Sequence, residues 1–145
     1  MLKNIESLIE GETDLVAVMS TISCELYHAF EYFNWVGFYR RINQSTLKVG
    51  PYQGTHGCLT IDIEKGVCGK CAKEGVFQIE NDVGAIPHHI ACSADTKSEM
   101  VLPIKDNRNN VRAVLDIDSK KINSFDEVDK KYLEELCKHV SERCI

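Results

Sequence analysis

The stretch that carries most of the reactive groups runs from residue 87 to residue 103 and reads PHHIACSADTKSEMVLP. It presents Cys92 near its start and Glu99 directly before an apolar run. If the loop between them folds back, this thiol and this carboxyl group can face one cavity. A thiol nucleophile beside a proton donor can attack an electrophilic centre and protonate the group that leaves. We therefore consider Cys92 and Glu99 candidate catalytic residues.

The cysteines indicate a reducing environment. There are seven, an odd number that cannot be paired completely within one chain. The N-terminal apolar stretch contains Glu6 and Glu10, which does not fit a secretion signal. We therefore expect a cytoplasmic protein, in which structural disulfides are rare.

Three of the cysteines, Cys58, Cys68 and Cys92, lie in glycine-rich and loop-rich segments. Thiols near one site suggest a nucleophile and a resolving partner that form a disulfide after oxidation. The alternative is that all three are buried and unreactive. Cys68 and Cys71 also form a C-x-x-C pair, which can be a redox dithiol or half of a zinc site, but His88 and His89 do not match the spacing that the other two ligands need. The simpler interpretation of Cys71 is a small residue on a short helix.

Two pairs of residues at i and i+2 or i+4 along expected strands could line a binding site. Asp116 and Asp118 point to the same face of one strand, as do Trp35 and Tyr39 on another. The two carboxylates either lie on a solvated face or bind a cation, such as a substrate ammonium group or a metal. The two aromatic rings are either ordinary core or an apolar wall with a hydroxyl donor.

Three long or amphipathic helices are expected to support these residues. Apolar periodicity predicts helices over residues 2–10 and 14–30, with Thr13 capping the second. A last helix is expected to start at Ser124, with Glu127 completing a capping box. The apolar stripe predicted for this helix consists of Phe125, Val128, Tyr132, Leu136 and Val140.

Alternating apolar and polar residues predict six extended segments between these helices. They cover residues 34–41, 47–52, a short piece opening at Cys58, then 76–79, 100–104 and 111–119. Residues 65–75 read as a loop that feeds a short helix, and residues 80–98 as a mostly irregular lid. The order predicts one α+β domain over residues 1–145, with a mainly antiparallel sheet and helices grouped on one face. A loop-covered pocket is expected on the other face.

The overall composition excludes some classes of function. The formal net charge is −5 and the pI is about 5.5, which disfavours nucleic acid as the main partner. The sequence has no run of about 18 apolar residues, so we expect no membrane span.

Several short motifs, in order and at consistent spacing, resemble the free methionine-(R)-sulfoxide reductases, which are single-domain GAF proteins. They are NWVGFY at 34–39, VGPYQG at 49–54, GVCG at 66–69, HIAC at 89–92, SEMVLP at 98–103 and LDIDS at 115–119. Each motif alone is weak, whereas the ordered set covers most of the chain and is specific. The GAF fold by itself would indicate only a small-molecule binding domain.

The resemblance implies a role for each candidate residue. Cys92 matches the catalytic cysteine that attacks the sulfoxide sulfur, and Cys58 and Cys68 match the other two redox cysteines. Glu99 matches the acid near the sulfoxide oxygen. The substrate-binding matches are Asp116, Asp118, Trp35 and Tyr39.

The implied activity is thiol-dependent reduction of free L-methionine (R)-S-oxide, with a sulfenic acid and an intramolecular disulfide as intermediates. The resemblance further implies thioredoxin as the external reductant, no bound cofactor or metal, and a possible homodimer. Which of Cys58 and Cys68 resolves Cys92 stays open, and so does the role of Cys71. Two alternatives remain: a non-catalytic GAF sensor, and a zinc module built on Cys68, Cys71 and His88.

Overall fold

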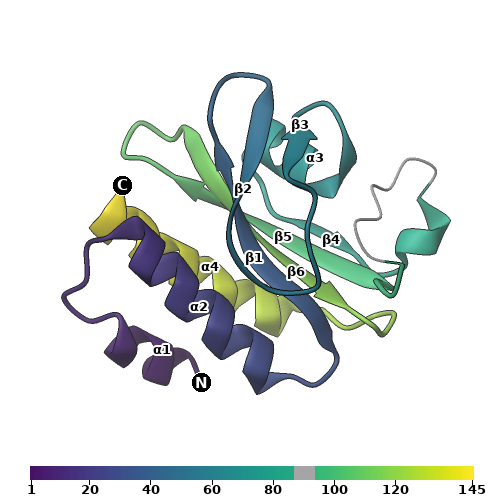
Figure 1. The fold of residues 1–145 in the computed structure, drawn as a ribbon, viewed down its shortest axis with the longest axis horizontal. Coiled ribbons are helices and arrows are strands. Elements are labelled where there is room, and N and C mark those ends of the chain that lie inside the picture. The colour runs from purple at the N-terminus through teal and green to yellow at the C-terminus, as the bar shows by residue number, and fades with distance from the viewer. Residues whose placement is uncertain (87–93) are drawn as a thin grey trace.

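The fold is built on one six-stranded antiparallel sheet, seen in the computed structural model of the chain (Figure 1). The structure describes residues 1–86 and 94–145. The strands lie in the order β3-β2-β1-β6-β5-β4. Their bounds are β1 Phe33–Arg41, β2 Thr46–Gly54, β3 Thr60–Asp62, β4 Gln78–Glu80, β5 Ser98–Lys105 and β6 Val111–Ser119.

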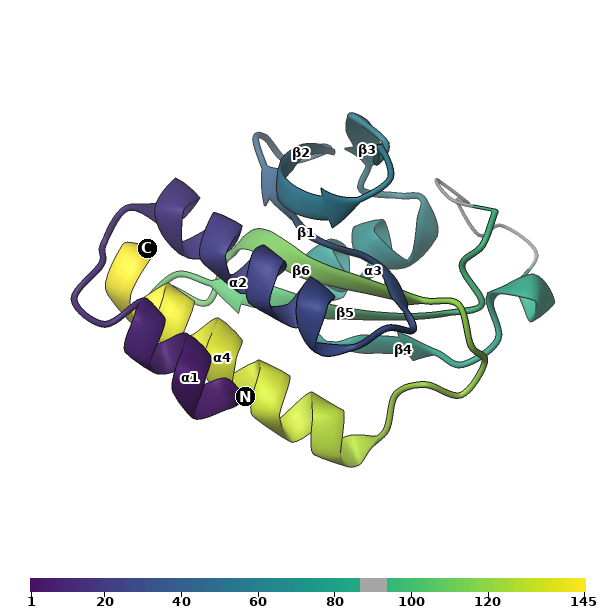
Figure 2. The same ribbon diagram turned by 60° about the horizontal axis from the view of Figure 1, so that its bottom comes forward.

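The helices divide between the two faces of this sheet. Figure 2 shows α1 (Leu2–Leu8), α2 (Leu15–Ala29) and α4 (Glu127–Cys144) on one face, while α3 (Gly66–Glu74) lies on the other. A 3-10 turn, η1 (Val83–Ala85), follows β4. The expected α+β class with an antiparallel sheet is therefore confirmed, with α3 as the one described helix outside the main group.

Each face of the sheet has its own hydrophobic core. The larger core joins α1, α2 and α4 to the sheet through buried side chains such as Met19, Leu26, Phe38, Leu102 and Leu136. The smaller core lies under α3 and includes Trp35, Tyr39, Val101, Val114 and Cys68. Since β1, β5 and β6 are buried on both faces, one sheet separates two buried layers.

The helix starts differ from the expected caps. Asp14, and not Thr13, caps α2, because its side chain accepts a hydrogen bond from the Ala17 N–H at 2.8 Å. Asp126, and not Ser124, caps α4 and forms a capping box with Asp129. In both cases a carboxylate at the helix start satisfies backbone donors that would otherwise lack a partner.

The predicted stripe of α4 was also partly wrong. Val128 and Tyr132 are 60% and 47% exposed, whereas Leu133 and Cys137 are buried together with Leu136 and Val140. The first half of the predicted stripe is therefore displaced, with Leu133 in place of Tyr132, while Phe125 precedes the helix and does not mark its phase.

The short helix expected within residues 65–75 is present, but it covers Gly66–Glu74 and leaves no room for the loop expected before it. This helix, α3, ends at Gly75, whose φ of 68° is the left-handed conformation that glycine adopts without strain. The change matters for Cys68, which was expected in a loop but lies buried in the first turn of α3.

Among the described residues, no helix is both long and apolar enough to cross a membrane.

Candidate functional site

Strand register brings the predicted acidic and aromatic residues onto one face of the sheet. Trp35 on β1 pairs with Asp118 on β6, Asp118 pairs with Glu99 on β5, and Glu99 pairs with Glu80 on β4. Directly opposed residues of antiparallel strands point to the same side. These four residues therefore form one row across four strands.

The neighbouring row continues the same surface. Gly37 on β1 pairs with Asp116, which pairs with Val101 on β5. The predicted face of β6 is thus the observed one, with Asp116 and Asp118 on the side that α3 covers. Glu99, Asp116 and Asp118 are all buried or partly buried, which excludes the interpretation of a solvated strand face.

The aromatic wall is a stack of three rings beside these acids. Trp35 lies between Tyr39 and Tyr52, with centroid separations of 5.7 Å and 5.1 Å and nearly parallel planes. The Trp35 indole N–H donates to the carbonyl of Thr55 at 3.0 Å, which fixes the ring. Gly37 makes room for the stack, because a Cβ there would lie 2.3 Å from the Tyr52 Cβ.

Helix α3 lies on this face of the sheet and places the thiol of Cys68 beside the carboxyl group of Glu99. The Cys68 Sγ lies 3.9 Å from the Glu99 Oε1. One ligand atom each from Cys68, Glu99 and Asp116 all lie within 4.8 Å of one another. The helix approaches closely at Gly69, where a Cβ would lie 2.6 Å from the Ile63 carbonyl oxygen. The next turn places Cys71 at 0% exposure among apolar side chains.

The electrostatics of this cluster favour protonated groups. Burial, and then the charge of Asp118, raise the pKa of Glu99 to about 8. Burial and the neighbouring Glu99 raise the pKa of Asp116 well above its usual range, and burial with Asp116 does the same for the pKa of Asp118. Three carboxyl groups this close cannot all ionise in a buried site.

The pKa of the Cys68 thiol is raised by burial and then by Asp116 and Glu99. Burial and then Asp116 also raise the pKa of Tyr39, so its phenol stays protonated. At neutral pH the site therefore offers carboxylic acids, a thiol and a phenol as donors. Cys68 is a poor nucleophile in this state because the thiolate is the reactive form.

Two carboxylate oxygens in the site are buried without a hydrogen-bond partner among the described residues, Asp116 Oδ1 and Asp118 Oδ1. Buried polar atoms are nearly always paired, so such oxygens indicate a place for a donor. Sequence reasoning missed the residues that hold this edge of the site. Asn34 Nδ2 donates to Thr96 Oγ1 at 3.1 Å, and Thr96 hydrogen-bonds to the Asp118 side chain. The position of Asn34 directly before Trp35 was the only signal in the sequence.

Of the two other predicted redox cysteines, the structure describes Cys58 but not Cys92. Cys92 lies outside the described residues, so its relation to Glu99 stays a prediction. Cys58 is disulfide-bonded and packs beside the smaller core. Five cysteines of the described residues are free thiols, namely Cys24, Cys68, Cys71, Cys137 and Cys144.

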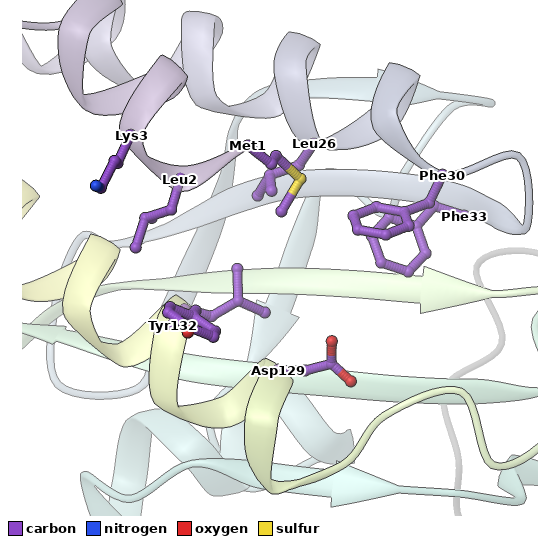
Figure 3. A pocket seen from close by; sticks show the side chains of 9 residues that line it. Met1, Leu2, Lys3, Leu26, Phe30, Phe33, Asp129 and Tyr132 are labelled. Atoms are coloured by element: carbon purple, nitrogen blue, oxygen red, sulfur yellow. The ribbon is translucent and has the colours of Figure 1, made fainter.

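A separate apolar hollow of about 340 Å³ lies between α1, α2 and α4 (Figure 3). Its lining is mostly hydrocarbon and aromatic, with contributions from Leu2, Leu26, Phe30 and Phe33. Asp129 and Lys3 are its only charged lining residues within the described part of the chain. Because it lies on the opposite face of the sheet from Glu99, Asp116 and Asp118, it is not part of the acid-lined site.

The fold and the acid-lined face define a class of protein. Residues 11–142 match the model of the GAF domain, and the chain belongs to that family. Within it, the chain is 39% identical over 151 residues to the free methionine-R-sulfoxide reductase of Saccharomyces cerevisiae. That alignment covers 100% of this chain and 84% of the yeast protein.

Two solved structures are similar over nearly the whole chain. The fRMsr of Staphylococcus aureus in its reduced form superposes with a TM-score of 0.92 at 40% identity, covering 99% of this chain and 92% of that one. Free methionine-R-sulfoxide reductase from Neisseria meningitidis, in complex with its substrate, gives a TM-score of 0.92 at 40% identity, covering 98% and 84%. The chain is therefore a member of the free methionine-R-sulfoxide reductase family, as its motifs predicted.

Proposed function

We propose that this protein, as a single GAF domain over residues 1–145, reduces free methionine-(R)-sulfoxide to methionine. The observation that carries the proposal is the pair of buried carboxylate oxygens of Asp116 and Asp118, which lack partners among the described residues. They lie beside a neutral Glu99 and an aromatic wall. Family membership supports the same reaction.

The binding step follows from charge and shape. A substrate ammonium group can donate hydrogen bonds to Asp116 and Asp118, and its charge would favour their ionised forms. The stacked rings of Trp35 and Tyr39 give the methyl group an apolar surface. Methionine sulfoxide within a peptide has a neutral amide in place of the ammonium group. It would leave the two acids unmatched and be rejected.

In the chemical step, the Cys92 thiolate attacks the sulfoxide sulfur while Glu99 protonates the departing oxygen. With a pKa of about 8, Glu99 carries this proton at neutral pH. Net, the oxygen passes to Cys92 as a sulfenic acid and methionine is released. No bound cofactor is needed, because the thiol supplies both electrons.

The sulfenic acid is then resolved by a second thiol, with loss of water and formation of a disulfide. We assign this step to Cys58, because Cys58 is disulfide-bonded whereas Cys68 is a free, buried thiol with a raised pKa. Thioredoxin would then reduce the disulfide and restore both thiols. Cys68 is left as a thiol that donates toward Glu99.

The activity is tested by adding free methionine-(R)-sulfoxide to the protein with a thioredoxin recycling system. We expect Cys92→Ser to lower the rate by at least about 10³-fold, since it removes the nucleophile. Cys24→Ser, which changes a free thiol on α2, is the matched control and should keep the wild-type rate. A Cys92→Ser rate close to wild type would reject the proposal.

The resolving thiol is tested separately. Cys58→Ser should still release one methionine per chain in a single turnover but fail to turn over with thioredoxin. Cys68→Ser should retain most of the thioredoxin-supported rate. The opposite pattern would assign resolution to Cys68.

The remaining parts of the proposal concern the cellular compartment and the oligomeric state of the enzyme. Five free cysteines in the described residues suit a reducing cytoplasm, where thioredoxin can act. A homodimer is also proposed from the family resemblance, and light scattering after gel filtration would test it.

A further inference from the structure

We propose that the buried cluster of Cys68, Glu99 and Asp116 is a binding site for a thiophilic divalent cation such as zinc. This site differs from the zinc module that the sequence suggested, because it uses two carboxylates in place of Cys71 and His88. One atom from each residue lies within 4.8 Å of the other two. Cys71, one turn further on α3, points into apolar packing.

The spacing of the cluster suits a single small ion. Zinc bonds of about 2.3 Å to sulfur and 2.0–2.2 Å to oxygen, at a tetrahedral angle, separate the two ligand atoms by roughly 3.5 Å. The Cys68 Sγ and Glu99 Oε1 are 3.9 Å apart. A shift of a few tenths of an ångström in one side chain would therefore complete this edge of the coordination sphere. A set of one thiolate and two carboxylates leaves a fourth position for water.

The second observation concerns Asp116, whose carboxyl group hydrogen-bonds with Glu99 and Cys68 and still keeps one oxygen without a partner among the described residues. Its side chain is 6% exposed, and its Oδ1 is buried without a hydrogen-bond partner among the described residues. A buried oxygen of this kind favours a cation or a donor. A dication would replace the repulsion among Glu99, Asp116 and Asp118 by attraction and would displace the thiol proton of Cys68 to solvent.

The cation would occupy the oxygens that the substrate ammonium group is proposed to use, so the two could not bind together. Inhibition by zinc is a consequence that rests on the proposed function. Binding of zinc does not, because it needs only the three side chains. The test therefore measures binding without substrate or turnover.

Zinc is titrated into the full chain in the state in which Cys58 is disulfide-bonded, against a coloured chelator. We expect one tightly bound zinc per chain. Cys68→Ala and Asp116→Asn should each weaken binding by at least about 10-fold, since each removes one ligand. Cys71→Ala, which removes a buried thiol on the same helix, should leave the affinity unchanged.

A second control excludes the other group of potential ligands in the described residues, Glu6, Glu135 and His139. His139→Gln should retain the tight zinc. X-ray absorption of the wild-type complex needs no variant and should show one sulfur among oxygen neighbours. No tight zinc in the wild type, affinity unchanged in both Cys68→Ala and Asp116→Asn, or two or more sulfur neighbours would overturn the proposal.

Discussion

At the scale of single residues, the property that most distinguishes the site is the proton that Glu99 keeps at neutral pH. In the unfolded chain this carboxyl group ionises near its ordinary pKa of 4.5, whereas in the fold its pKa is about 8. Below pH 4.5, Glu99 is protonated in both the folded and the unfolded state, so its ionisation does not change the free energy of unfolding. As pH rises from 4.5 to 8, the unfolded state gains the free energy of ionisation first, so the folded state loses stability.

The substitution Glu99→Gln removes this loss while keeping the shape of the side chain. We expect it to stabilise the protein by on the order of 2–4 kcal/mol at about pH 8 and to have little effect at about pH 5. Urea unfolding at the two pH values measures the difference. Glu80→Gln, in the next strand of the same row, is the control and should change stability little at either pH. A gain of equal size at both pH values for Glu99→Gln would contradict the assignment of the proton.

The same residue sets the expected pH dependence of the reaction. If the proton of Glu99 is needed, the rate should fall as pH rises through its pKa of about 8, because the acid form disappears. In Glu99→Gln this limb of the profile should vanish together with most of the rate. Single-turnover rates between about pH 6 and pH 9 would measure it, and an unchanged alkaline limb in the variant would assign it to another group.

At the scale of elements, β1 positions the aromatic wall through one glycine. Trp35 and Tyr39 flank Gly37, and Tyr52 of β2 lies opposite it. Gly37→Ala would place a methyl group 2.3 Å from the Tyr52 Cβ and 2.6 Å from the Trp35 ring. The Tyr52 Cβ is attached to the backbone and cannot move aside, so the rings must separate.

We therefore expect Gly37→Ala to lower the free energy of unfolding by about 1–3 kcal/mol and to disturb the stack. Trp35 is the only tryptophan, so its fluorescence reports this change directly. The matched control is Gly50→Ala on β2, where the nearest atom to the new Cβ is a carbonyl oxygen at 3.2 Å. An unchanged emission spectrum in Gly37→Ala would show that the stack tolerates the methyl group.

Elements also show what the sequence could and could not predict. The face shared by Asp116 and Asp118 was predictable, because alternation along a strand of nine residues has one solution. The row that adds Glu80 was not, because it depends on the pairing of β4 with β5, which no local pattern encodes. The cap of α4 was predicted at Ser124, whereas the helix begins at Glu127 and Asp126 caps it. Cys68 was misplaced because glycines at 66 and 69 suggested a loop, whereas Gly69 allows α3 to pack closely.

At the scale of the whole molecule, the sheet lies between a core without proposed chemistry and a face that carries the candidate site. Leu136 on α4 is 1% exposed and belongs to the larger core, together with Leu102 and Leu115 of the sheet. Val101 and Asp116 are the adjacent residues of the same strands and point to the site. Loss of packing on one face should therefore affect the structure of the other face only when the shared sheet unfolds.

This arrangement predicts the effect of a cavity far from the site. Leu136→Ala should lower the free energy of unfolding by about 2–5 kcal/mol, because it removes a buried leucine side chain. Val128→Ala on the same helix is the control, since Val128 is 60% exposed. It should cost less than about 1 kcal/mol.

Urea unfolding of Leu136→Ala is followed by two signals from opposite faces of the sheet. Helical circular dichroism reports mainly α1, α2 and α4, and Trp35 fluorescence reports the side that α3 covers. If the sheet joins the two cores into one cooperative unit, both signals shift to the same lower midpoint. A Trp35 transition that keeps its wild-type midpoint would show that the α3 side unfolds independently.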